Sequence, residues 1–253
     1  MSIQAKTDIK HYSSGDEVTA RADLLDLLKT APIPDDQLLS NMGLFLDSKN
    51  LSRLLFMDFL YRQIIDVQGV VMEFGTRWGQ NVALYAALRG IYEPFNRHRK
   101  LVAFDTFTGF PSVTGADGKS DLMQTGQLAT AKDYPAFLAK VLAAQEALNP
   151  LSHLEKFEIC AGDAIEELPA YLERAPQSIV ALAYFDFDIY EPTKKCLEMI
   201  RGRLTKGSVV GSDELNDPDS PGETLALMET FGLSNIKLKR FPYASRVSYF
   251  VVE

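Results

Sequence analysis

The chain is poor in cysteine, histidine and tryptophan. Its 253 residues include two cysteines, three histidines and one tryptophan. Cys160 and Cys196 lie in a strand-like run and a helix-like run, without the spacing of a metal site or a redox pair. We therefore expect two buried free thiols in a reducing cytosol. The sequence also shows no pattern of two histidines and one carboxylate, which argues against a non-haem iron oxygenase.

Clusters of basic residues are also missing. The chain has 26 Lys and Arg against 34 Asp and Glu, a formal net charge of −8. This balance argues against nucleic acid or an anionic membrane as the main partner. The polar leader over residues 1–17 has no apolar signal core, and no apolar run reaches membrane-spanning length. We therefore expect a cytoplasmic protein that acts on a small molecule.

From residue 69 onward, apolar runs of strand length alternate with amphipathic stretches. The predicted strands cover 69–74, 101–105, 157–163, 179–186, 207–213, 235–241 and 246–252. The predicted helices cover about 78–90, 134–148, 164–174, 192–203 and 222–231. This alternation predicts parallel βαβ units, and the two final runs, with no helix between them, predict an antiparallel pair at one edge. The expected fold is α/β and Rossmann-like, with a seven-stranded, mostly parallel sheet and one antiparallel edge strand.

The first part of the chain has a different pattern. Apolar residues recur at helical spacing over 22–30 and 50–66. We predict a helical extension over 1–66, which would form a lid, a dimer surface or a substrate wall, and a main domain over 67–253. We also expect a homo-oligomer. The long irregular segment 106–133 interrupts the alternation of strands and helices and is predicted to be a mobile lid.

Two acidic clusters follow apolar runs, in YFDFDIYEPT (184–193) and VVGSDELND (209–217). The four carboxylates should gather at the carboxyl ends of two strands, where open α/β sheets bind ligands. They are Asp186, Asp188, Asp213 and Glu214. Carboxylates that share a dry crevice repel one another unless a cation or a proton compensates. Oxygen ligands of this kind suit Mg²⁺ better than a transition metal.

The segment VVMEFGTRWGQN (70–81) places Gly75 and Gly79 at the turn between the first strand and its helix. Glycines there let the backbone come close to a ligand. The spacing is Gly-x-x-x-Gly, which differs from the Gly-x-Gly-x-x-Gly of dinucleotide-binding proteins. Glu73, just before the turn, would repel a pyrophosphate but suits an ammonium group.

Acidic residues also end the next two predicted strands. Asp105 is placed to accept hydrogen bonds from ribose hydroxyls, and Asp163 to meet an adenine amino group. Together with the glycine turn, they predict an adenosyl ligand with a cationic tail, which is S-adenosylmethionine. We include the neighbours Thr106 and Ala164, and Asp186, in this cofactor site. The alternative is that aspartates at strand ends cap the following helices.

These segments together resemble a known family. The motifs are GVVMEFGTRWGQN, FDTFTGFP (104–111), GDAIEELP (162–169), YFDFDIYEPT and the acidic pair at 213–214. They look like the macrocin O-methyltransferases, which are Mg²⁺-dependent, class I S-adenosylmethionine enzymes that methylate sugar hydroxyls of antibiotics and related glycosides. The likeness covers about 40–235. It implies a class I methyltransferase fold and a sugar or glycoside as acceptor.

By this resemblance, Asp186, Asp213 and Glu214 would hold the metal, and Asp188 would be the general base. A sugar hydroxyl is a poor nucleophile, so coordination by Mg²⁺ and proton removal by Asp188 would activate it. Alternatively, Asp188 caps the following helix. A catechol-type enzyme usually has a Lys three positions after the first Asp, where this chain has Ile189. The remaining alternative is a non-catalytic adenosyl-binding protein on the same fold.

Overall fold

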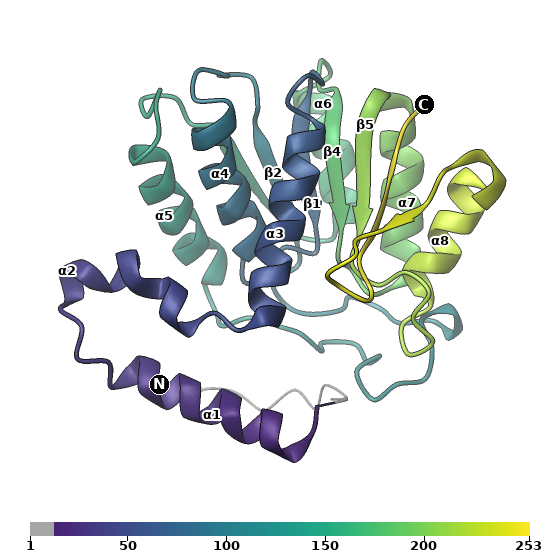
Figure 1. Cartoon of the computed structure of the whole chain (residues 1–253). Helices are drawn as coiled ribbons and strands as arrows, with labels where there is room; N and C mark the ends of the chain where they lie inside the picture. Colours follow the sequence, from purple (N-terminus) through teal and green to yellow (C-terminus); the bar gives the residue numbers. More distant parts are fainter. Residues whose placement is uncertain (1–12) are drawn as a thin grey trace.

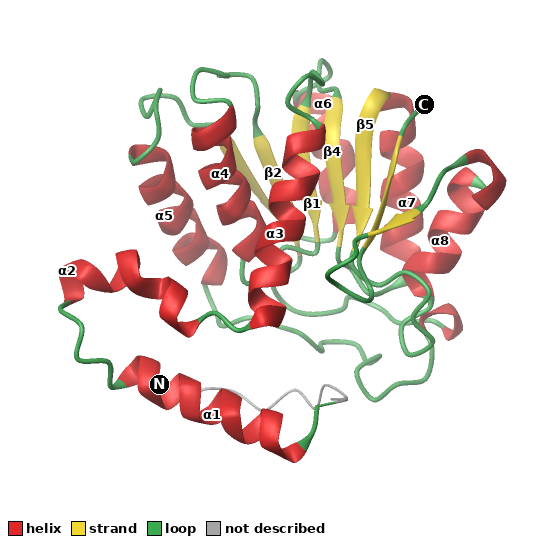
Figure 2. Ribbon diagram, viewed as in Figure 1, coloured by secondary structure: helices red, strands yellow, loops and turns green. Residues whose placement is uncertain are grey.

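The structure is a computed structural model that describes residues 13–253. Residues 1–12, which include most of the polar leader, lie outside the described residues. The described chain contains a seven-stranded sheet in the order β3-β2-β1-β4-β5-β7-β6 (Figures 1 and 2). The strands are β1 Val70–Phe74, β2 Leu101–Asp105, β3 Phe157–Ala161, β4 Val180–Phe185, β5 Leu204–Ser212, β6 Lys239–Arg240 and β7 Ser248–Val251.

Strands β1 to β5 pair in parallel, and β7 pairs antiparallel with both β5 and β6. The predicted α/β fold with a mostly parallel sheet and one antiparallel strand near the edge is therefore confirmed. The run 235–241 forms only a two-residue strand, β6, outside β7. The central strands are long apolar runs because helices cover both faces of a parallel sheet.

Helices form one layer on each side of the sheet (Figure 1). The helices that follow the strands are α4 Gln80–Tyr92, α5 Tyr134–Ala147, α6 Ala164–Arg174, α7 Tyr190–Ile200 and α8 Gly222–Phe231. One buried cluster joins α4 and α5 to the sheet, and a second joins α6, α7 and α8 to the opposite face. Single-turn 3₁₀ segments follow α7 and α8, at Arg201–Arg203 and Leu233–Asn235.

The described part of the N-terminal extension, residues 13–66, is largely helical, as predicted, but its helices differ in how much of their surface packs against the rest of the protein. They are α1 Gly15–Lys29, α2 Asp35–Leu38, the 3₁₀ segment η1 Leu39–Phe45 and α3 Ser48–Gln63. Helix α1 has no buried residue and lies on the side toward which β4 and β5 point (Figure 1). The division of the chain at residue 66 and the homo-oligomer remain predictions.

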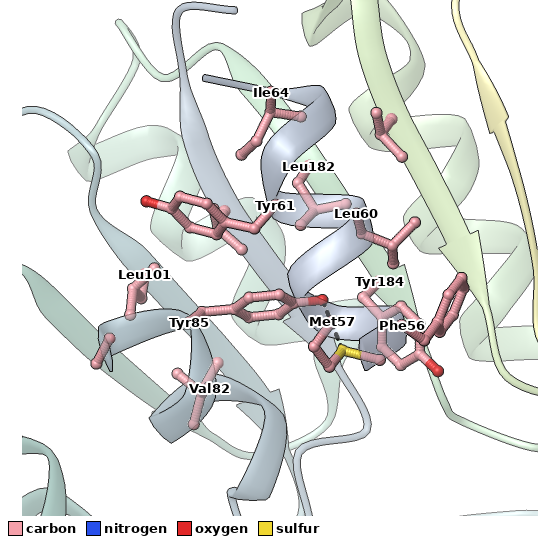
Figure 3. Close-up of a cluster of buried hydrophobic side chains, with 14 of the residues drawn as sticks. Phe56, Met57, Leu60, Tyr61, Ile64, Val82, Tyr85, Leu101, Leu182 and Tyr184 are labelled. Carbon is pink, nitrogen blue, oxygen red and sulfur yellow. Dashed lines mark hydrogen bonds between the residues drawn. The ribbon is translucent and has the colours of Figure 1, made fainter. Parts of the chain in front are cut away.

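Helix α3 is built into the core of the sheet domain. Its side chains Phe56, Met57, Leu60 and Tyr61 are fully buried. Figure 3 shows them clustered with side chains of α4 and of the strands, and the Tyr85 hydroxyl donates to Met57 Sδ at 3.0 Å. Burial of such side chains stabilises by about 1.5–3 kcal/mol each. Helix α3 is therefore anchored on the sheet, and its residue Arg53 lies at the carboxyl ends of β4 and β5.

The segment 106–133 carries its own small apolar cluster. It contains the 3₁₀ turn η2 Gly115–Asp117, and its buried Phe110 and Met123 pack with Ile189 at the start of α7. Asp117 within it is 1% exposed. The predicted mobility of this segment stays a prediction, but its middle is packed against the sheet domain.

The two cysteines are free and buried, as expected. Within residues 13–253, no helix combines the length and the apolar character that a membrane crossing requires.

Candidate functional site

The strand order reverses between β1 and β4, and ligands bind in the crevice outside such a reversal. The register places Phe74 beside Phe104 and Phe185, and Phe185 beside Ser212. The next residue of each strand or turn therefore lies in one row across this edge. That row consists of Gly75, Asp105, Asp186 and Asp213.

The two glycines of the first turn are required by the backbone. Gly75 has φ +90°, and a Cβ there would lie 1.9 Å from the Asp186 carbonyl oxygen. Gly79 has φ +76° and precedes α4, where a Cβ would meet Leu138 at 2.3 Å. A larger residue at Gly75 would clash with the backbone at the end of β4, and one at Gly79 would adopt a strained φ and displace the Leu138 side chain. Both glycines lie in the turn between β1 and α4, as the sequence predicts.

Glu73 is a buried carboxylate without an ion-pair partner among the described residues, although the Asn81 side chain and the charge of Arg53 both act to lower its pKa. It is 1% exposed, and neither of its oxygens has a hydrogen-bond partner among the described residues. Burial, followed by the negative charge of Asp186, raises the pKa of Glu73 to about 8. An unpaired buried carboxyl beside another acid is unfavourable unless a cation compensates it. This position therefore suits a cationic ligand group.

Asp105 ends β2 and binds the backbone of two neighbouring turns. Its Oδ2 accepts from the Arg77 N–H at 2.7 Å, and its Oδ1 accepts from the Phe107 N–H at 2.6 Å. Burial raises its pKa despite these two hydrogen bonds. The Thr106 hydroxyl donates a hydrogen bond to the Gly109 carbonyl oxygen at 2.6 Å. Each carboxylate oxygen of Asp105 retains a second lone pair for a ligand hydroxyl.

Asp163 follows β3 and caps α6, since its Oδ1 accepts from the Ile165 N–H at 2.9 Å. Asp163 therefore caps the following helix, as the alternative interpretation of the sequence predicted. Ala164 is buried as the first residue of α6. A binding role of either residue toward adenine stays a prediction.

Arg53, on α3, joins the acidic ends of β4 and β5. Its Nη2 lies 2.6 Å from Asp186 Oδ2, and its Nη1 donates to Asp213 Oδ1. The Tyr184 hydroxyl also donates to Asp213 Oδ1, at 2.6 Å. Burial and the charge of Asp213 raise the pKa of Asp186 to about 8, although Arg53 opposes this change. The guanidinium therefore neutralises only part of the negative charge.

A second arginine reaches the end of β5 from the loop before β7. Arg246 forms ion pairs with Glu214 and, at 3.3 Å, with Asp217. Its side chain is half exposed, so these pairs contribute little to stability. The Oε2 atom of Glu214 is buried and has no hydrogen-bond partner.

Asp188 lies in the turn between β4 and α7 and is 6% exposed. Burial, followed by the negative charge of Glu214, raises its pKa well above the ordinary value. Glu223, on α8, faces the same turn and is 1% exposed. Burial and the charge of Glu214 also raise the pKa of Glu223. The structure thus brings together the four predicted carboxylates and adds a fifth.

Sequence reasoning missed Arg53, Glu223 and Asp117, a buried residue of the 106–133 segment. Each lies outside the sequence motifs, on a helix or loop whose docking decides where its side chain points. Among residues 13–253, no group of three or more His, Cys, Asp or Glu side chains is arranged to hold a metal ion. The ion pairs with Arg53 and Arg246 draw Asp186, Asp213 and Glu214 toward guanidinium groups instead.

Comparison with solved structures gives two close matches over nearly the whole chain. The calicheamicin methyltransferase CalS11 is 42% identical with a TM-score of 0.93, and the match covers 98% of this chain and 99% of that chain. The apo structure of CalS11, described as a TDP-rhamnose 3'-O-methyltransferase, is 41% identical with a TM-score of 0.85 and coverages of 95% and 96%.

The O-methyltransferase NovP shares the fold, with 20% identity, a TM-score of 0.62 and 80% of each chain covered. No protein-family profile and no curated protein sequence matches the chain.

Proposed function

The chain belongs to the macrocin type of sugar O-methyltransferases, and we propose that it methylates a hydroxyl group of a nucleotide-linked sugar. It is an S-adenosylmethionine-dependent O-methyltransferase. The nucleotide-linked acceptor is suggested by the relative that acts on TDP-rhamnose, which is 41% identical over 95% of this chain. Free sugars and glycosides are the competing acceptors.

The observation that carries the cofactor proposal is the buried carboxylate of Glu73, which forms no ion pair among the described residues. It is buried beside the Gly75 turn, and the ammonium group of the methionine moiety would supply the missing cation. The spare lone pairs of Asp105 would accept from the ribose hydroxyls. Thr106, Asp163 and Ala164 extend this proposed binding edge toward the adenine.

Asp188 is proposed to accept the proton of the acceptor hydroxyl. An ordinary carboxylate is a weak base, and a base is most effective when its pKa lies near the working pH. The support for this role is the position of Asp188, which is buried in the turn at the carboxyl end of β4, two residues after Asp186. A positioned base contributes about 10²–10⁴-fold to the rate.

The donor chemistry of the site fits a hard divalent cation. Among the described residues, the carboxylates at this edge outnumber the two arginines, Arg53 and Arg246, that form ion pairs with them. The Oε2 atom of Glu214 also has no hydrogen-bond partner. We propose that Asp186, Asp213 and Glu214 would hold Mg²⁺ once Arg53 and Arg246 release them. The ion would acidify and orient the acceptor hydroxyl. Asp186 would then serve both the metal and the cofactor edge.

The test is a methyl-transfer screen with TDP-rhamnose, free rhamnose, a rhamnoside and catechol, each with Mg²⁺ and with chelator. We expect turnover with the nucleotide sugar. Turnover with catechol alone would favour the catechol-type alternative, and turnover that resists chelator would overturn the metal proposal.

Variants of the acidic residues separate the proposed metal from the proposed base. Asp186→Asn and Asp213→Asn should raise the Mg²⁺ concentration needed for half activity. Asp188→Asn should lower kcat by roughly 10²-fold or more with an unchanged Mg²⁺ midpoint. The N-cap of α7 is Ile189 without a side-chain cap, so the structure contradicts the helix-cap alternative for Asp188. An Asp188→Asn enzyme with full turnover would therefore remove Asp188 from the catalytic role and require another proton acceptor.

A further inference from the structure

The turn that carries Asp188 has a backbone shape that must be held in place. Asp188 has φ +63°, which lies in the left-handed region that residues other than glycine rarely adopt. Such a conformation persists only when surrounding contacts enforce it. The turn 187–190 lies between the end of β4 and the first residue of α7, Tyr190, so the contacts of its backbone decide where the Asp188 side chain points.

Glu223 supplies the first of these contacts. Its Oε1 accepts from the Phe187 N–H at 2.9 Å and from the Asp188 N–H at 3.3 Å. The preceding Gly222 permits this approach, since a Cβ there would lie 2.6 Å from the Tyr190 nitrogen. The first turn of α8 is therefore seated directly on the turn that carries Asp188.

Asp117 supplies the second contact, from the segment 106–133. Its Oδ1 accepts from the Tyr190 N–H at 2.5 Å, and its Oδ2 accepts from the Thr114 N–H at 2.6 Å and the Thr114 hydroxyl at 2.9 Å. Asp117 and Glu223 are each 1% exposed. Two buried carboxylates from separate parts of the chain thus accept from three backbone N–H groups of one turn.

We propose that Glu223 and Asp117 are positioning residues that hold the turn 187–190 and aim Asp188 at the acceptor hydroxyl. This proposal rests on the proposed base role of Asp188. A buried carboxylate is unfavourable for packing alone, and an apolar side chain of similar size would fill the same space. The hydrogen bonds to the turn are the interactions that an apolar residue cannot replace.

The proposal also gives the 106–133 segment a function beyond covering the site. The segment begins at the proposed ribose-binding Asp105 and reaches the turn of the proposed base through Asp117. A displacement of this segment would remove the acceptor of the Tyr190 N–H. The same segment therefore links the cofactor edge of the sheet to the position of Asp188.

The experiment combines hydrogen exchange of single amides with steady-state kinetics. Glu223→Leu should increase exchange at the amides of Phe187 and Asp188, and Asp117→Ala should do so at Tyr190, each by about tenfold. Both variants should lower kcat by roughly 10²-fold while the Kd for S-adenosylhomocysteine changes less than twofold.

Glu223→Gln and Asp117→Asn keep an oxygen acceptor, so they should recover most of the amide protection and of kcat. They also serve as the test if the apolar variants fail to fold. The matched control is Glu229→Leu on the same helix, whose carboxylate pairs with Lys194 and the Tyr190 hydroxyl rather than with the turn backbone. It should leave exchange at the three amides and kcat unchanged.

Unchanged amide exchange in Glu223→Leu and Asp117→Ala would overturn the positioning role. Lost kcat that the amide variants fail to rescue would overturn it as well. Full turnover of Asp188→Asn would instead overturn the proposed base, and the hydrogen-exchange result would still show whether the two carboxylates hold the turn. The two failures are therefore distinguishable.

Discussion

Arg53→Met tests whether the guanidinium group of Arg53, on α3, occupies the place of a metal cation among the carboxylates at the strand ends. The arginine side chain is 27% exposed, and its partners Asp186 and Asp213 are 21% and 9% exposed. Removing one partner of a fully buried pair costs about 3–5 kcal/mol, so this partly exposed pair should lose about 2–3 kcal/mol of unfolding free energy. Methionine keeps the apolar contacts of the stem, so the loss reports mainly the charge.

The loss should grow as the pH rises. The folded-state pKa of Asp186 is raised to about 8 from its ordinary value of 3.8, so its ionisation destabilises the folded state between about pH 4 and pH 8. Without Arg53, that pKa rises further. Below about pH 8 Asp186 is protonated in both folded proteins, so its contribution to the difference between variant and wild type should appear only as the pH rises through about 8.

The assay is urea unfolding in chelator and in Mg²⁺. If the three proposed ligands bind the ion, Mg²⁺ at about 100 times its Kd should stabilise the variant by about 2.7 kcal/mol. The wild type should gain less, because Arg53 competes for Asp186 and Asp213. Arg62→Met is the control, since Arg62 lies on the same helix, is 61% exposed and pairs only weakly with Asp58 at 3.9 Å.

Two results would refute this reasoning. Equal unfolding of Arg53→Met and wild type in chelator would show that the ion pairs with Asp186 and Asp213 contribute nothing. A variant that Mg²⁺ does not stabilise would show that the released carboxylates do not hold the ion.

The remaining predictions concern the cofactor edge and the 106–133 segment. Asp105→Ala should weaken S-adenosylhomocysteine binding by about 1–3 kcal/mol in calorimetry, through the lost ribose hydrogen bonds; unchanged affinity would remove Asp105 from the cofactor site. Protease cleavage near 115–119 should slow when cofactor and acceptor are added, because the segment should become ordered over a filled site. Cleavage should quicken in Asp117→Ala, which loses the anchor to Tyr190, and equal rates in all conditions would argue against a lid.

The sequence by itself determined the layout of the sheet and the edge at which the acidic residues meet. Asp186 directly follows the apolar run VALAYF, and Asp213 directly follows the run that ends in VVGS. Because parallel strands end at a common edge, two apolar runs were enough to predict that these carboxylates lie close together. The Gly75 turn was equally local, since its backbone shape depends on its own residues and on the neighbouring strand.

Only the tertiary structure decided which groups surround those carboxylates. The position of Arg53 depends on how the apolar face of α3 packs on the sheet. In the sequence, Arg53 is a polar residue of an amphipathic helix, and nothing distinguishes it from a residue that faces solvent. Glu223 and Asp117 reach the turn of Asp188 because α8 and the 106–133 segment dock against it. Long-range packing sets these contacts. Hydrophobic periodicity predicts helices and strands, but it does not predict which distant side chain will face a given turn.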